Sequence, residues 1–208
     1  MSSKPDTTQI SRYAYAVKPR RYVELSSGRY VAAKAVRSAA DDIIDTQTVK
    51  IKEIASKYVA GSINLAEWQL QTAAIVKSTH VAMALAANGG YANTSNADLG
   101  FIAGKVKEQY KYLRDFALQI KKGQQPLDGT LASRSALYIQ SARGTYEAVV
   151  SRAASNGGAT QEKSMLGPSD HCSDCIGEAT KGWSPIDSLI PIGERICKAN
   201  CRCSFSYK

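Results

Sequence analysis

Five cysteines are the residues of this chain whose type and spacing could do chemistry. They lie in the last 37 residues, as a Cys-x-x-Cys pair and a Cys-x-x-x-Cys-x-Cys group: Cys172, Cys175, Cys197, Cys201 and Cys203. A Cys-x-x-Cys turn can point two thiolates at one ion, and a second pair supplied across the intervening loop completes a tetrahedron. The pattern therefore predicts a structural Zn²⁺ site.

The choice among these donors stays open at the level of sequence. A structural zinc ion takes four ligands, and the expected set is Cys172, Cys175, Cys197 and Cys201. Cys203 competes for the fourth position, and His171 is expected to lie outside the ligand shell. Two disulfides plus one free thiol are the alternative, which requires an oxidising compartment, and unligated thiols are a third.

The rest of the chain offers little that could support catalysis. The sequence contains no phosphate-binding glycine loop, no Gly-x-Ser-x-Gly elbow and no His-Glu-x-x-His motif. One of its two histidines, His80, falls near the apolar stripe of a predicted helix, where a hydrogen-bonded core histidine is expected. Because four thiolates also close a zinc ion to substrates, we expect neither enzymatic activity nor a small-molecule substrate.

The elements that must position the cysteines are mainly helical. Stripes of apolar residues predict four helices that start near residues 36, 65, 99 and 131. Glycines are placed to end them at Gly61, Gly89, Gly123 and Gly157. Amphipathic helices joined by short loops bury their stripes against one another, which predicts a bundle. Five aromatic residues at helical spacing are expected in its core: Tyr110, Tyr112, Phe116, Tyr138 and Tyr146.

Local signals complete the expected architecture. Asn64 and Glu67 have the spacing of a capping box at the start of the second helix. Two alternating runs around a Ser-Ser-Gly turn predict a β-hairpin over residues 21–31, preceded by a mobile arm at 1–10. The fold class is thus mainly α, a multi-helix bundle with an N-terminal β-hairpin and a small C-terminal cysteine-rich zinc-binding module. The expected divisions are 1–34 for the basic arm and hairpin, 35–158 for the bundle and 159–208 for the cysteine-rich module.

The charge of the chain is concentrated at its two ends. The formal net charge is +9, and residues 38–193 contribute 15 basic and 15 acidic side chains, which balance. Basic ends favour DNA or an acidic protein surface, although solvated tails that aid solubility are the alternative. No apolar run approaches the roughly 20 residues of a membrane helix, and the N-terminus lacks the apolar core of a secretory signal. We therefore expect synthesis in the cytoplasm and no membrane partner.

Several motifs carry a family resemblance. The most C-terminal motif consists of His171-Cys172-x-x-Cys175 and, further on, Cys197-x-x-Asn200-Cys201-Arg202-Cys203. The others are Gly28-Arg29-Tyr30-Val31, Leu65-Ala66-Glu67-Trp68-Gln69, Tyr110-Lys111-Tyr112-Leu113-Arg114-Asp115-Phe116, Gly182-Trp183-x-Pro185-Ile186 and Pro191-Ile192-Gly193. From about residue 20 onward the chain resembles the head-morphogenesis, or minor capsid, proteins of tailed phages, the group related to protein F of phage Mu.

The resemblance implies a minor component of the virion that acts with the portal during head assembly. Portal or other virion proteins are then the expected partners, with DNA contacted through the basic termini as an addition or as the alternative role. Many relatives carry His-Pro before the Asn-Cys-Arg-Cys ending, where this chain has Lys198-Ala199 and a cysteine, Cys197, one position upstream. This departure implies that a histidine ligand of the relatives is replaced here by a cysteine.

Overall fold

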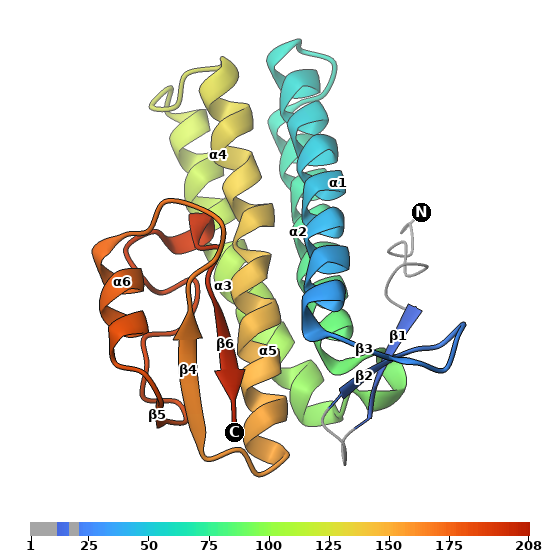
Figure 1. Ribbon diagram of the computed structural model, residues 1–208. Coiled ribbons are helices and arrows are strands. Elements are labelled where there is room, and N and C mark those ends of the chain that lie inside the picture. Colours follow the sequence, from blue (N-terminus) through green and yellow to red (C-terminus); the bar gives the residue numbers. More distant parts are fainter. Residues whose placement is uncertain (1–11, 17–20) are drawn as a thin grey trace.

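A computed structural model describes residues 12–16 and 21–208 of the chain. Long helices dominate it, and small antiparallel sheets occur near the beginning and near the end of the chain (Figure 1). The mainly α fold class with N-terminal β structure and a C-terminal cysteine cluster is confirmed. The predicted mobile arm at residues 1–10 lies outside the described residues. The proposed domain boundaries stay a prediction.

The N-terminal sheet contains the predicted hairpin and one further strand. Its antiparallel strands β1 (Tyr13–Ala16), β2 (Arg21–Glu24) and β3 (Tyr30–Val31) lie in the order β1-β2-β3. β1 was not predicted, because four residues of alternating Tyr and Ala are too short to give a periodic signal. The hydroxyl of Tyr22 donates a 2.7 Å hydrogen bond to the carbonyl of Ala87, which anchors the sheet to the second helix.

Helices form the body of the protein. In chain order they are α1 (Ala33–Val59), α2 (Leu65–Asn88), the short 3-10 helix η2 (Tyr91–Asn93), α3 (Asn96–Lys121), α4 (Gly129–Gln140) and α5 (Ala142–Asn156). The predicted capping box is present, since Asn64 accepts from the Glu67 amide at 2.9 Å while Glu67 accepts from the Asn64 amide at 2.8 Å. These two bonds satisfy free amides of the first turn and fix the start of α2.

The predicted fourth helix is wrong in one respect, because it is two helices that meet at Ser141. The Ser141 hydroxyl donates to the backbone carbonyl of Tyr138 at 2.8 Å. This bond competes with the backbone ladder, as serine side chains inside helices can. Just beyond the interruption, a Cβ on Gly144 would lie 3.0 Å from the carbonyl of Ile192, so glycine lets the C-terminal segment approach α5 closely.

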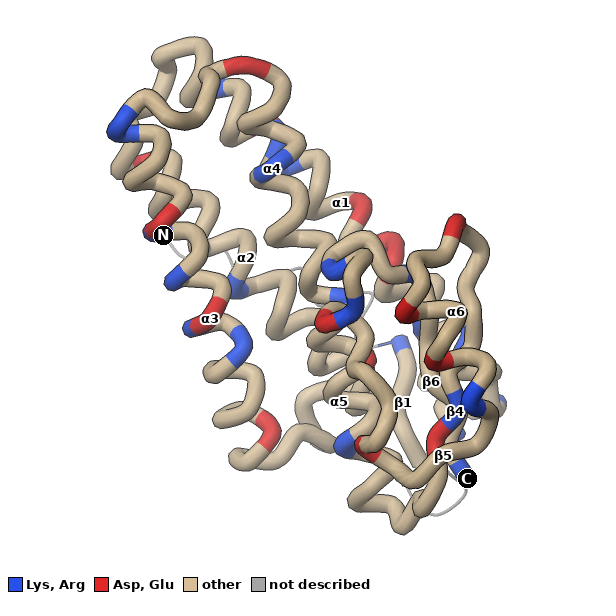
Figure 2. The backbone as a smooth tube through the Cα atoms, turned by 90° about the vertical axis from the view of Figure 1, so that its left-hand side faces the viewer, with Lys and Arg blue, Asp and Glu red and all other residues tan. Residues whose placement is uncertain are grey.

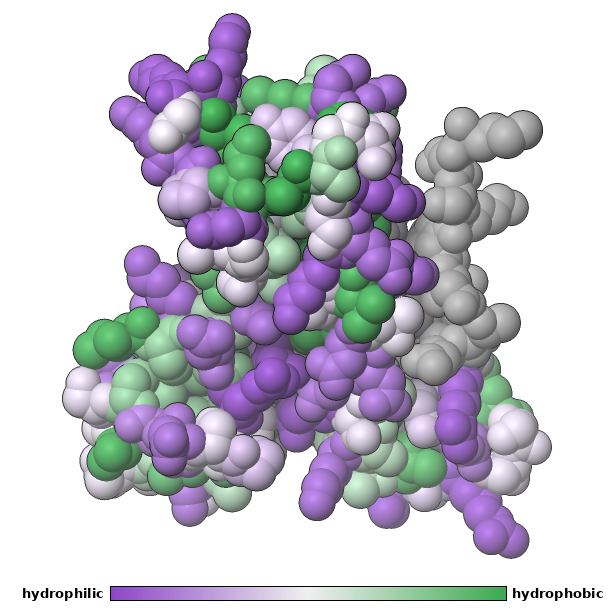
Figure 3. All heavy atoms as spheres, turned by 90° about the horizontal axis from the view of Figure 1, so that it is seen from above, coloured by the Kyte–Doolittle hydropathy of each residue, from purple (hydrophilic) through white to green (hydrophobic). Residues whose placement is uncertain are grey.

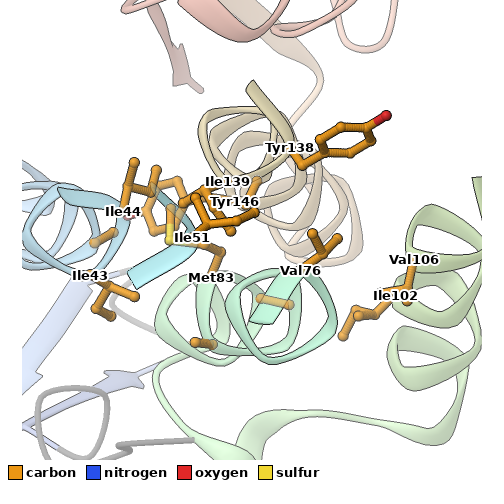
Figure 4. Close-up of a cluster of buried hydrophobic side chains, with 14 of the residues drawn as sticks. Ile43, Ile44, Ile51, Val76, Met83, Ile102, Val106, Tyr138, Ile139 and Tyr146 are labelled. Atoms are coloured by element: carbon orange, nitrogen blue, oxygen red, sulfur yellow. The ribbon is translucent and has the colours of Figure 1, made fainter. Parts of the chain in front are cut away.

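α2 lies at the centre of the bundle and contacts α1, α3 and α5. Figure 4 shows Val76 of α2 facing Ile102 and Val106 of α3, while Met83 lies on the other side toward α1 and α5. All four of these side chains are buried. Trp68 is fully buried and packs edge-on against Phe116 at 5.4 Å between ring centroids. The amphipathic stripes thus meet as predicted.

Two of the five aromatic residues expected in the core lie at the surface instead. Tyr110 is 37% exposed and Tyr112 is 49% exposed, whereas Phe116, Tyr138 and Tyr146 are buried as predicted. Seen from above the helices, green hydrophobic side chains are scattered among purple hydrophilic ones (Figure 3). A mixed surface of this kind is normal for a folded protein.

A second sheet and a second hydrophobic cluster follow the bundle. β4 (Gln161–Met165) lies between β5 (Ser184–Pro185) and β6 (Ser204–Tyr207) in an antiparallel sheet, and β6 packs against α5. The cluster next to this sheet is separate from the bundle core and consists of Cys175, Leu189, Ile192, Cys201, Cys203 and Phe205. Half of its members are cysteines, so this part of the chain has few hydrocarbon side chains of its own.

Candidate metal centre

Three local elements bring the cysteines together. Cys172 is the N-cap of α6 (Ser173–Thr180), and Cys175 lies in the first turn of that helix. Cys197 and Cys201 flank the short 3-10 helix η3 (Lys198–Asn200). Cys203 directly precedes β6, which places it beside the same cluster. The structure thus gathers all five predicted cysteines in one place.

Three sulfur atoms lie around Cys175 Sγ at distances close to those between ligands of one tetrahedral ion. Cys175 Sγ lies 3.5 Å from Cys172 Sγ, 3.5 Å from Cys197 Sγ and 3.7 Å from Cys201 Sγ. Metal–sulfur bonds of about 2.3 Å at tetrahedral angles place ligand sulfurs about 3.8 Å apart. The donor atoms of Cys172, Cys175 and Cys197 all lie within 4.8 Å of one another and could hold one metal ion, whereas Cys201 is close to Cys175 but does not belong to that group.

The same sulfur–sulfur distances are too long for the disulfide bonds of the alternative prediction. All five cysteines are free thiols, and the Sγ–Sγ separations of 3.5–3.7 Å around Cys175 exceed the bond length of about 2.05 Å. Burial raises the pKa of the Cys175 thiol, but Arg195 and the neighbouring cysteines lower it to about 7 overall. Burial raises the pKa of Cys197 and of Cys203 instead, so a metal ion that binds these two thiols has to displace their protons.

His171 and Cys203 lie close to each other and to Cys175. Cys203 Sγ is 3.8 Å from His171 Nδ1, and the donor atoms of His171, Cys175 and Cys203 all lie within 4.8 Å of one another. A second group with this property consists of Cys172, Cys175 and Cys197. His171, expected outside the shell, is therefore close to the cluster, and which four donors bind one ion stays a prediction.

Three carboxylates that sequence reasoning missed hold the backbone around the cysteines. Glu162 accepts a hydrogen bond from the Leu189 amide at 2.9 Å, and Glu178 accepts from the Ile190 amide at 3.2 Å. Asp174 accepts from the amide of Ile196, next to Cys197, at 2.8 Å. Glu162 and Glu178 are buried, so these bonds replace water for both partners. The loop that carries Cys197 is thus fixed from three sides. A single sequence gives no periodic signal for such bonds.

Arg195 is the other residue that sequence reasoning missed. Its side chain is fully buried; Nε donates to the Ile190 carbonyl at 3.0 Å, and Nη2 donates to Ser164 Oγ at 3.1 Å. Its guanidinium also lies over the ring of Phe205, with Cζ 5.3 Å from the centroid. Four thiolates around a divalent ion carry a net charge of −2, which is costly to bury without compensation. Arg195 supplies one positive charge at this place.

We expect Arg195→Met to lower the metal affinity about 10- to 100-fold, the range for lost outer-shell partners of metal ligands. Arg195→Lys should restore part of the affinity, because it keeps the charge and loses the planar fork. Competition with a chromophoric chelator measures both. Arg202→Met is the matched control, since Arg202 is exposed and lies between two of the cysteines. Equal affinities for the Arg195 and Arg202 variants would contradict a role for the buried charge.

The largest cleft described around this centre lies between it and the bundle. Its volume is about 850 Å³, and its lining includes Cys197, Ser141 and His80. His80 is 1% exposed, and its Nδ1 lies 2.7 Å from Thr145 Oγ1, so the prediction of a hydrogen-bonded core histidine is confirmed. Burial lowers the pKa of His80 to about 4, opposed by a hydrogen bond to the Tyr138 backbone. His80 is therefore neutral at physiological pH and supports the junction of α4 and α5.

Comparisons with known proteins found no matching family model, no matching curated protein and no matching solved structure. The resemblance to phage head-morphogenesis proteins therefore rests on the motif residues alone and stays a prediction. Within the described ranges, no helix has the length and apolar character needed to cross a membrane.

Proposed function

We propose that this chain is a minor structural protein of a tailed-phage head or neck, held in shape at its C-terminal end by a zinc ion. The observation that carries the proposal is the cluster of four sulfur donors around Cys175, in the motif that resembles the phage family. A zinc ion with four protein ligands stabilises a fold and has no open position for a substrate. The role is thus in assembly and not in catalysis.

Zinc is the ion that best suits the donors. Thiolates are soft ligands that select zinc, copper(I) or iron–sulfur clusters, and a tetrahedral site with four of them favours zinc or iron. Elemental analysis of protein purified under reducing conditions should give about one zinc per chain. Iron in place of zinc, or no metal at all, would overturn the assignment.

The C-terminal module is small enough to need the ion. Its hydrophobic cluster has only six members, and cysteines make up half of it. Structural zinc contributes about 10–16 kcal/mol of apparent binding free energy to small domains. The bundle has a separate and larger core of its own. This division supports a rigid helical body that presents a metal-stabilised module to other virion proteins.

Binding to the portal protein encoded by the same genome tests the assembly role. Size-exclusion chromatography of the two purified proteins should show co-elution, and the chain should be present in purified particles. A portal protein from an unrelated phage is the control. The proposal would be wrong if the chain were absent from purified particles and bound neither the portal nor the capsid protein.

DNA binding is the second candidate function, and one observation favours it. A cleft of about 360 Å³ is lined by both ends of the described chain, including Arg21, Tyr22, Arg37 and Tyr207. Residues of the two ends thus meet at this cleft, and its two basic side chains, Arg21 and Arg37, both come from the N-terminal end. Along α3, Lys and Arg are interspersed with Asp and Glu (Figure 2). Arginines interleaved with aromatic rings are typical of nucleic-acid surfaces.

Charge reversal at Arg21 and Arg29 tests this candidate. Both side chains are exposed, and Arg21 lies over the Tyr30 ring, with Cζ 4.8 Å from its centroid. If they contact phosphates, the double variant to Glu should reduce the slope of log affinity against log salt by about 2 in gel-shift titrations. Lys50→Glu with Lys52→Glu, on exposed positions of α1, is the control and should leave the slope nearly unchanged. No binding by the unmodified chain near physiological salt would discard DNA binding.

A further inference from the structure

The cluster holds more donors than one ion can use. Five thiols and one imidazole lie together, whereas a tetrahedral zinc ion takes four ligands. If Cys172, Cys175, Cys197 and Cys201 bind the first ion, two donors, Cys203 and His171, are left over. Both lie beside the cluster rather than elsewhere in the fold, and Cys203 is 1% exposed.

The left-over donors form a group with one ligand of the first ion. The donor atoms of His171, Cys175 and Cys203 lie within 4.8 Å of one another, and so do those of Cys172, Cys175 and Cys197. The two groups share the Cys175 sulfur. A zinc ion with bonds of about 2.3 Å to sulfur and about 2.0 Å to nitrogen spaces these atoms about 3.6 Å apart. The 3.8 Å between Cys203 Sγ and His171 Nδ1 fits that spacing.

We propose that His171, Cys175 and Cys203 form a second site for a thiophilic divalent cation, Zn²⁺ or Cd²⁺, and that the Cys175 thiolate bridges it to the first ion. The inference rests on the proposed zinc centre, because the second site borrows a ligand from it. With three protein donors against four, the second ion binds more weakly and leaves first when metal is limiting.

Charge balance favours the second ion. Four thiolates and one divalent ion carry −2, and the buried guanidinium of Arg195 reduces this to −1. A second divalent ion with the Cys203 thiolate adds one further positive charge, which brings the group to neutrality. Neutral groups are far cheaper to bury than charged ones, so the second ion removes an electrostatic cost that the first ion leaves.

The second site also has a route for the ion to enter. His171 is only partly buried and directly precedes Cys172 at the start of α6, whereas Cys203 lies deep in the cluster. An ion can therefore meet the imidazole first and pass to the buried sulfurs. The imidazole is a ligand that zinc accepts as readily as thiolate.

Native mass spectrometry of the full chain counts the ions during stepwise addition of Zn²⁺, and separately of Cd²⁺. We expect two mass steps, the first at limiting metal and the second at excess. His171→Ala and Cys203→Ser should each abolish the second step and keep the first. His171 belongs to neither hydrophobic cluster, so its variant should fold even if loss of the Cys203 thiol disturbs packing.

The outcomes separate this inference from the proposed zinc centre. No tightly bound ion in the unmodified chain would overturn the zinc centre itself. A single ion at all metal concentrations would leave the centre standing and overturn the second site. A second ion that persists in both variants is bound elsewhere on the surface, and this result also overturns the second site.

Discussion

Replacement of Cys175 by serine should abolish metal binding and unfold the C-terminal module while α1–α5 stay folded. Cys175 Sγ lies within 3.7 Å of three other sulfurs, and Cys175 belongs to both groups of donors that could hold an ion, so its loss breaks both groups. Loss of a structural zinc ion removes about 10–16 kcal/mol of apparent binding free energy. The module's small hydrophobic cluster cannot compensate for a loss of this size. The bundle has a separate core of its own, so we expect it to stay folded without the ion.

Far-UV circular dichroism and limited proteolysis measure this outcome. Most of the helical signal should remain, since α6 is only 8 residues long and α1 alone has 27. New cleavage sites should appear after residue 158. Chelation of the unmodified protein should reproduce the same pattern. Ile176→Ser is the matched control, because Ile176 follows Cys175 in α6 and is 51% exposed. Global unfolding would show that the bundle and the module form one cooperative unit.

The helices could be predicted because their signals are local. Each apolar stripe and each terminal glycine acts within one segment, and the Asn64–Glu67 capping box needs only residues three apart. The interruption at Ser141 could not be predicted in this way. It involves the Ser141 side chain, which bonds to the Tyr138 carbonyl. It also involves the approach of the Ile192 carbonyl to Gly144, which depends on a segment almost fifty residues later.

The prediction that Tyr110 and Tyr112 lie in the core is wrong for a related reason. Tyr110 and Tyr112 have the spacing or hydrophobicity expected of a core stripe, but α3 lies at the edge of the bundle and covers only one neighbour extensively. Periodicity shows which residues share a face, and it does not show how wide a strip of that face is covered. The outer helix therefore exposes more of its apolar stripe than α2, which has neighbours on several sides.

Only part of the metal centre, likewise, can be predicted from residue types and spacing. The rest depends on tertiary packing. The spacing of the five clustered cysteines is enough to predict a candidate metal site. The buried guanidinium of Arg195 and the carboxylate of Glu162 are polar residues in a loop-rich region, where solvent exposure is the ordinary expectation. They become part of the site only because β4 and the loop before Cys197 fold against each other. Nothing in one sequence encodes that contact locally.

Replacement of Arg37 by methionine should destabilise the bundle by about 3–5 kcal/mol at neutral pH, the usual cost of breaking a buried ion pair. Arg37 Nε donates to Glu147 Oε1 at 2.9 Å, and Glu147 is 1% exposed. Burial raises the pKa of Glu147 above its usual 4.5, and Arg37 opposes this rise. Without Arg37, the pKa of Glu147 should rise further, because only the smaller effects of the Phe205 backbone hydrogen bond and of Arg143 still oppose the burial.

This shift gives the loss of stability a definite pH dependence. A carboxyl whose folded-state pKa is raised costs stability once the pH exceeds its unfolded value, because the unfolded chain then loses the proton more readily. The difference between Arg37→Met and the unmodified protein should therefore be larger at pH 8 than at pH 5. Urea denaturation at the two pH values measures it. Lys34→Met, an exposed change in the same helix, is the control. Adding Glu147→Gln should remove the pH dependence, and an equal loss at both pH values would show that Glu147 is not the group responsible.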